Sequence, residues 1–156
     1  MKILRKSCST LIFVYSIIIW STIISCNSNQ LRKTPIENFK GIWELQGREM
    51  FKGIKVDIEQ DKDGKLIGRV IELNDNKFVK MFVEINDIWV SEIVRHSNFE
   101  FGLTEKKIGS ALFSVYGQET SKEFKAQFID NNTIGLATQN TDPLLSTIKY
   151  VRVVNK

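Results

Sequence analysis

The side chain best suited to proton transfer is His96, because it is the only imidazole among the 156 residues. A hydrolytic triad would need this histidine beside an activated serine, but the sequence has no Gly-x-Ser-x-Gly turn to present one. His96 follows Arg95 and precedes Ser97 and Asn98 at the end of an expected strand. We therefore expect a surface turn residue without a catalytic role.

A second group of residues could hold a hard cation. Asp61, Asp63 and Gly64, with Glu72 further along, look like the start of a calcium loop, since closely spaced oxygen ligands suit that ion. The third ligand is missing, however, and Gly64 comes two residues too early for such a loop. The segment is better explained as a Gly-containing hairpin turn between two strands.

Carboxylate pairs are the third possibility for chemistry. Glu84 and Glu92 are expected on adjacent strands, and Glu92 shares a face with apolar residues of the segment 88–94. An inward acid must be solvated, paired or neutralised, so Glu92 could be a polar contact in a cavity or an acid with a raised pKa. Pairing with Arg69 or Arg95 across the sheet is the alternative.

The cysteines direct attention to the N-terminus. Lys2, Arg5 and Lys6 precede an apolar run at 11–24, and no acid occurs before Cys26. A helix over that run would cover about 21 Å, less than the roughly 30 Å of a bilayer's hydrocarbon core. The composition and length are typical of an export signal.

The segment 23–26, Ile-Ile-Ser-Cys, resembles the lipobox of bacterial lipoproteins. The resemblance implies that residues 1–25 are a signal peptide, that Cys26 carries the lipid, and that residues 26–35 are the lipidated Cys and its tether. Two or more acyl chains anchor a protein stably. We therefore expect a bacterial cell envelope protein, facing the periplasm, with the membrane as its partner. An uncleaved anchor, or a secretory signal with an incidental cysteine, is the alternative.

Removing residues 1–25 changes what the composition implies. Three cations leave with this segment, so the formal net charge falls from +4 to +1. A balance this even gives no electrostatic argument for nucleic acid or for a polybasic membrane patch. With Cys26 alkylated, no thiol remains for a disulfide, a cysteine nucleophile or a zinc site. We expect no metal and no cofactor.

Beyond Phe39 the apolar residues recur with period two, which predicts half-buried β-strands. The expected strands include the segments 54–58, 79–85, 88–94, 99–101, 111–116, 124–128 and 147–153. Turn-prone residues separate them every 10 to 20 positions, and such short links join antiparallel neighbours. One helical turn is expected at 34–39, and Asp142-Pro143 should break any strand. The sequence thus predicts an all-β domain over residues 36–156, with eight to ten strands in a meander.

Many antiparallel strands must close into a barrel or stack as a sandwich. Gly41-x-Trp43, at the start of the first strand, resembles the opening motif of the lipocalins and the wider calycin group. The resemblance implies a small up-and-down barrel in which Trp43 plugs the closed end and a basic residue of the last strand packs across it. Arg152 stands where that partner is needed. Avidin-like barrels share the motif and stay open as an alternative, whereas the two-helix lid of fatty-acid-binding proteins has no counterpart in the sequence.

Aromatic residues are the main candidates for ligand contact. In a small barrel, inward aromatics either fill the lumen or line a pocket for an apolar ligand. Outward ones, such as Phe82 or Trp89, would mark a patch for a partner or a lipid surface. The candidate ligand contacts are Glu92, Phe99, Phe101, Phe113 and Tyr116.

Taken together, the residues predict a lipid-anchored envelope protein whose barrel binds a hydrophobic or amphipathic small molecule without catalysis. A filled barrel acting as a protein-interaction or inhibitor module is the alternative. An enzyme has the least support, because the usual nucleophile, metal and cofactor patterns are missing from the sequence.

Overall fold

The computed structural model describes residues 33–138 and 140–154, and the segment Lys33–Lys156 forms a compact unit. The signal peptide expected at 1–25, the lipidated cysteine and most of the tether lie outside the described residues. Within those residues, none of the helices has the length and apolar character needed to cross a bilayer. The hydrophobic cluster of this unit is built from its own side chains, so residues 33–156 carry what a domain needs to fold alone.

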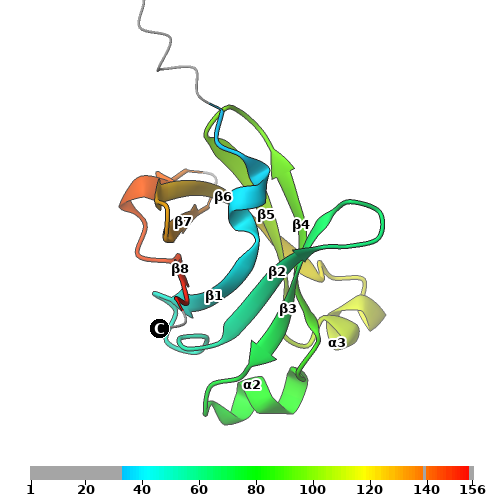
Figure 1. The fold of residues 1–156 in the computed structure, drawn as a ribbon. Coiled ribbons are helices and arrows are strands. Elements are labelled where there is room, and N and C mark those ends of the chain that lie inside the picture. The colour runs from blue at the N-terminus through cyan, green and yellow to red at the C-terminus, as the bar shows by residue number, and fades with distance from the viewer. Residues whose placement is uncertain (1–32, 139, 155–156) are drawn as a thin grey trace, which may run out of the picture. The chain divides into compact units, whose positions relative to one another are not determined.

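Eight strands form a closed antiparallel barrel in which each strand pairs with the next and β8 closes onto β1 (Figure 1). The strands are β1 (Gly41–Gln46), β2 (Lys55–Gln60), β3 (Leu66–Glu72), β4 (Ile88–Arg95), β5 (Glu100–Lys106), β6 (Ser121–Asp130), β7 (Thr133–Ala137) and β8 (Lys149–Arg152). The predicted fold class, an all-β up-and-down barrel, is therefore confirmed.

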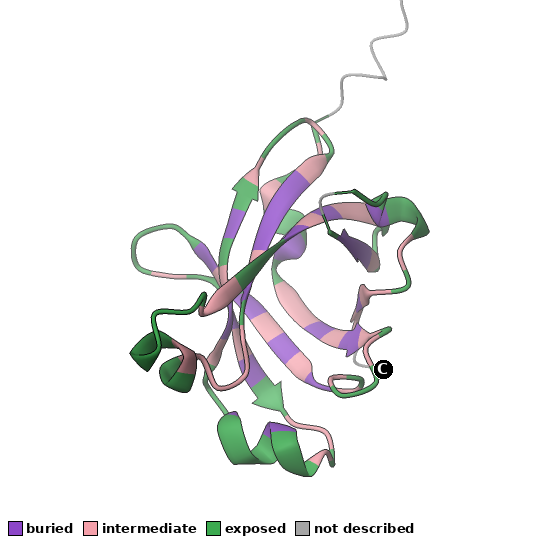
Figure 2. Cartoon of the chain, turned by 180° about the vertical axis from the view of Figure 1, so that it is seen from behind, coloured by how far each residue is buried: buried purple, intermediate pink, exposed green. Residues whose placement is uncertain are grey.

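Buried residues alternate with more exposed ones along the strands (Figure 2), as the period of two in the sequence predicts. In β2, Val56 and Ile58 are buried while their neighbours stay partly or fully exposed. The turn after β2 is the expected hairpin: the Asp61 carboxylate accepts hydrogen bonds from the backbone N–H groups of Asp63 and Lys65. Gly64 completes the turn with φ of 82°, a conformation that favours glycine.

The barrel is closed at one end around Trp43. Its indole is fully buried and donates a hydrogen bond of 2.6 Å to the carbonyl oxygen of Phe39. The guanidinium of Arg152 lies 4.1 Å from the centroid of the Trp43 ring, so the contact expected from the sequence is present. Arg152 also donates to the carbonyl oxygens of Asn38 and Lys40, at 2.6 and 2.8 Å. The Arg152 side chain thereby joins the last strand, the indole of Trp43 and the segment before β1.

Gly41 is needed for this arrangement. Its φ is 114°, and a Cβ there would lie 3.0 Å from Nη1 of Arg152. A larger residue would therefore be strained and would crowd the guanidinium. This gives the glycine of the Gly-x-Trp pair a physical role beyond its resemblance to a family motif.

The closed end is filled by aromatic side chains. Phe39 ends a short 3₁₀ turn, η2 (Ile36–Phe39), and packs edge-on against Phe101 and Phe128 with ring centroids 4.8 and 4.7 Å away. The described chain starts at this same end, where the Thr34 N–H donates to the carbonyl oxygen of Asn98, 2.9 Å away. The turn expected at 34–39 is thus present, with Pro35 at its N-cap position.

Two of the expected strands are wrong. The segments 79–85 and 111–116 contain instead the short helices α2 (Lys77–Phe82) and α3 (Ser110–Val115), both beyond the ends of strands. The Asn76 side chain caps α2 by accepting from the N–H groups of Phe78 and Val79. Val79 is the only buried residue of α2, and α3 has none. Because these short helices bury almost nothing, the spacing of their apolar residues does not distinguish a helix from a strand.

A third short turn, η3 (Pro143–Leu145), occupies the connection between β7 and β8. The Asp142 carboxylate caps it by accepting from the Leu144 N–H at 2.9 Å. The expected break at Asp142-Pro143 is therefore confirmed.

Candidate functional site

The barrel end opposite Trp43 holds a pocket of about 400 Å³, within the range of small-molecule sites. Its wall comes from the loop after β1, the start of β4, the end of β5, α3, the start of β6 and the residue before β8. We call it the mouth pocket. Its apolar lining consists of Phe51, Trp89, Ile108, Phe113, Phe124 and Ile148. Phe51 and Trp89 pack edge-on at 5.3 Å, which fixes one side of the wall.

A polar group lies at the boundary between this pocket and the filled core. Glu105 is 4 % exposed and accepts two hydrogen bonds from Arg48, at 2.6 and 2.8 Å. The hydroxyl of Tyr150 donates to the same carboxylate at 2.6 Å. Arg48 also lies 4.9 Å from the centroid of the Phe51 ring. These buried contacts connect the loop after β1, which carries Arg48, to β5 and β8, which carry Glu105 and Tyr150.

The pKa values of these groups follow from their burial and partners. Burial alone would lower the pKa of the Arg48 guanidinium, but hydrogen bonds and charge attraction from Glu105 outweigh it, and the net pKa is raised. Burial and the Glu105 carboxylate raise the pKa of the Tyr150 hydroxyl well above its usual value. Tyr150 therefore stays a protonated donor over the physiological range.

Two donors beside this group have no hydrogen-bond partner among the described residues. They are the Nε–H of Arg48 and the indole N–H of Trp89, whose side chain is only 3 % exposed. The nearby Trp89 N–H, like the charge of Arg48, acts to lower the Tyr150 pKa and so opposes part of its rise. It does not, however, form a hydrogen bond to the phenol oxygen. Buried donors of this kind favour an acceptor from solvent or from a ligand.

The candidate ligand contacts expected from the sequence are divided by the structure. Phe113 lines the mouth pocket. Phe101 is fully buried, but it belongs to the packed closed end. Phe99 and Tyr116 are 43 % and 73 % exposed, which contradicts their expected place in a pocket, because Phe99 lies in a turn and Tyr116 ends the exposed helix α3.

The expectation for Glu92 is also wrong, because its side chain is exposed on the outer wall. β4 has an irregularity between Val90 and Glu92 that inserts one residue against β5. Val90 and Ile93 are consequently the inward residues, and Glu92 turns outward. Glu84 follows α2 in a loop and does not pair with Glu92 across a sheet. A second irregularity, between Gly68 and Arg69, accompanies the inward turn of Trp89, which had been expected outside.

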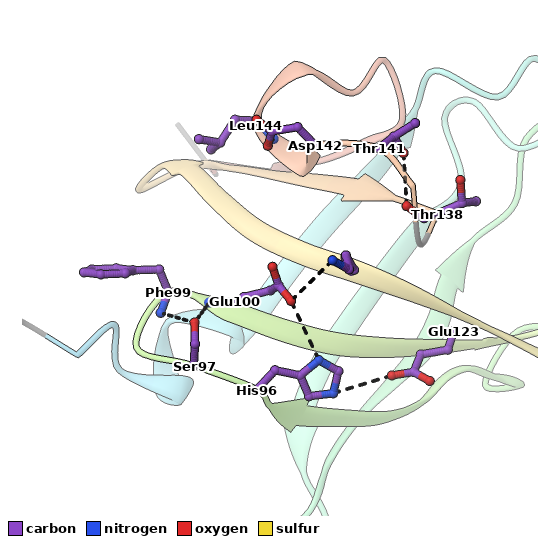
Figure 3. Close-up of polar contacts among 10 residues, drawn as sticks. His96, Ser97, Phe99, Glu100, Glu123, Thr138, Thr141, Asp142 and Leu144 are labelled. Atoms are coloured by element: carbon purple, nitrogen blue, oxygen red, sulfur yellow. Dashed lines mark hydrogen bonds and ion pairs between the residues drawn. The ribbon is translucent and has the colours of Figure 1, made fainter.

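His96 lies on the outer wall at the end of β4, as expected for a surface turn residue (Figure 3). Its two ring nitrogens face Glu100 and Glu123 at 4.0 and 3.6 Å, and its side chain is 43 % exposed. The ring lies over Gly102, where a Cβ would approach it to 2.9 Å. Within the described residues, no group of three or more His, Cys, Asp or Glu side chains could hold a metal ion.

Sequence reasoning missed the polar group of Arg48 and Glu105. A signal existed for Glu105, which continues the inward alternation of Phe101 and Leu103 along β5. Arg48 had none, because it lies in a loop whose path is set by the barrel. Comparison of the chain with known protein families, with curated proteins and with solved structures found no match.

Proposed function

We propose that this protein binds a hydrophobic or amphipathic small molecule in the mouth pocket, without catalysis. The observation that carries the proposal is the pocket itself: six apolar side chains surround about 400 Å³ at the open end of a barrel whose other end is packed. Desolvation of an apolar ligand against such a wall contributes about 25 cal/mol per Å² of buried area. The buried Arg48, Glu105 and Tyr150 group supports the pocket from below.

Filling the pocket tests this proposal. Ile148 lines the mouth pocket, so Ile148→Trp should abolish binding of the neutral fluorescent probe N-phenyl-naphthylamine to residues 33–156. Ile71→Trp is the matched control, because Ile71 is 37 % exposed near the end of β3 and does not line the pocket. Equal probe binding by both variants, with unchanged thermal unfolding, would refute the assignment of the site.

We propose further that the protein is a bacterial envelope lipoprotein of lipocalin-like type, anchored through Cys26. Supporting this are the 23–26 segment in the sequence and the joint geometry of Gly41, Trp43 and Arg152 at the closed end. Metabolic labelling with an alkyne-bearing fatty acid should mark the full chain and leave the Cys26→Ser variant unlabelled. Labelling of both would refute lipidation at this residue.

A second function, a protein-interaction module, is favoured by one observation. Large apolar side chains on and around α2 and α3 are exposed, at fractions between 48 % and 78 %: Phe78, Met81, Phe82, Ile85, Leu112, Val115 and Tyr116. Exposed apolar patches on a small domain mark interaction surfaces. Replacing Phe78 and Met81 by serine should abolish capture of an envelope protein and leave probe binding intact, because neither residue lines the mouth pocket. Unchanged capture by this variant would refute the second function.

A further inference from the structure

The mouth pocket combines its apolar wall with an excess of positive charge. Four cationic residues line it, namely Arg48, Lys106, Lys107 and Lys122, against the single acid Glu105. Glu105 already accepts two hydrogen bonds from Arg48 and one from Tyr150. The charge of Arg48 is therefore balanced inside the protein, and the three lysines remain as the net charge of the rim.

These lysines are available to a ligand. Lys107 lies 3.3 Å from Glu119, but that carboxylate is 88 % exposed, and exposed pairs of this kind are weak. Neither Lys106 nor Lys122 forms an ion pair with another described residue. Lys122 pairs across the sheet with inward Glu105, which puts it on the lumen side of β6, and its ammonium lies 5.0 Å from the Phe124 ring centroid. A cation thus stands directly over the apolar wall.

We propose that the ligand of the mouth pocket is an anionic amphiphile, with its acidic head at Lys106, Lys107 and Lys122 and its apolar chain against Phe51, Trp89 and Phe124. This inference rests on the proposed function, because it assigns the ligand class of the same pocket. The head stays at the rim, since the polar group below is already neutral as a pair. Charge attraction at such a partly solvated rim gives selectivity for the anion and falls with added salt.

Three probes with the same chain separate charge from hydrophobicity: decanoate, decanol and decylamine, titrated into residues 33–156 by calorimetry. Decanoate is expected to bind about tenfold more tightly than decanol, and its advantage should shrink severalfold between low and high salt. Lys106→Ser/Lys122→Ser should remove most of that advantage. Lys65→Ser/Lys125→Ser, which removes the same charge from the hairpin after β2 and from the outer wall, should leave it unchanged.

The orientation has its own readout. Decanoate brominated at its last carbon should quench the fluorescence of Trp89 more strongly than decanoate brominated next to the carboxylate. Equal binding of decanol and decanoate, tighter binding of decylamine, or the reverse order of quenching would overturn the anionic assignment and leave the proposed function standing. Absence of binding by all three probes, with cooperative unfolding retained, would overturn both.

Discussion

The buried pair of Arg48 and Glu105 makes a prediction that the geometry quantifies. Glu105→Gln keeps the size of the side chain but removes the charge that balances Arg48. Breaking a buried pair by removing one partner costs about 3 to 5 kcal/mol, because the other charge stays buried. Arg48 is 18 % exposed, so some water reaches it, and we expect about 3 kcal/mol for this variant.

The double variant tests the cause of that loss. Arg48→Met leaves Glu105 with Tyr150 as its remaining donor and should cost about 3 kcal/mol as well. Arg48→Met/Glu105→Gln removes both charges, so its loss should be about 1 to 3 kcal/mol, well below the sum of the two single losses. A coupling energy of several kcal/mol is therefore expected.

Urea unfolding of residues 33–156 at pH 7 measures these values, with the buried indoles of Trp43 and Trp89 as fluorescent reporters. The slopes with urea should agree among the variants, so that the midpoints report stability. Glu119→Gln is the control, because its exposed pair with Lys107 should contribute less than about 1 kcal/mol. Additive losses, or a Glu105→Gln variant within about 0.5 kcal/mol of the parent, would show that the pair is not coupled.

Three further variants test other parts of the structure, each by urea unfolding. Tyr150→Phe concerns pH, because the raised pKa of this phenol adds stability that is present below about pH 10 and is lost as the pH rises toward the folded-state pKa. In that alkaline range the free energy of unfolding of the parent should fall by up to about 1.4 kcal/mol per pH unit through this group, and the variant should lack this contribution. The same pH dependence in parent and variant would contradict this prediction. Arg152→Lys should cost about 1 to 2 kcal/mol, since an ammonium cannot replace both the stacking on Trp43 and the forked hydrogen bonds, while Arg69→Lys on β3 should cost below about 0.5; equal losses would deny the closure contact its role. Gly68→Ala should lower the free energy of unfolding by about 1 to 3 kcal/mol, because its Cβ would lie 2.8 Å from Val56 and 2.9 Å from Val90. An unchanged stability would show that the neighbouring side chains move aside to accept the added methyl group.

The parts of the fold that follow from local patterns could be predicted from the sequence. The alternation in segments such as 54–58 reflects one-sided burial, and one-sided burial decides the backbone of a strand in a barrel. The partnership of Trp43 and Arg152 was also predictable, because closure of a meander brings the last strand beside the first.

Other features depend on tertiary context that no local pattern records. One inserted residue between Val90 and Glu92 exchanges the faces of β4 beyond it, so Glu92 turned outward although its spacing favoured the interior. α2 and α3 bury almost nothing, and their apolar residues therefore carry no information about the core. Arg48 reaches Glu105 only because the barrel places residues 57 positions apart at one depth.

The place where the described chain begins has a consequence for access. The Thr34 N–H is hydrogen-bonded to the β4–β5 turn at the closed end of the barrel. Eight peptide units separate Thr34 from Cys26, which is at most about 29 Å of fully extended chain. A lipid on Cys26 would thus be joined by a short tether to the closed end of the barrel. The attachment point would then lie at the end of the barrel away from the mouth pocket, so the tether itself would leave the pocket open to a ligand.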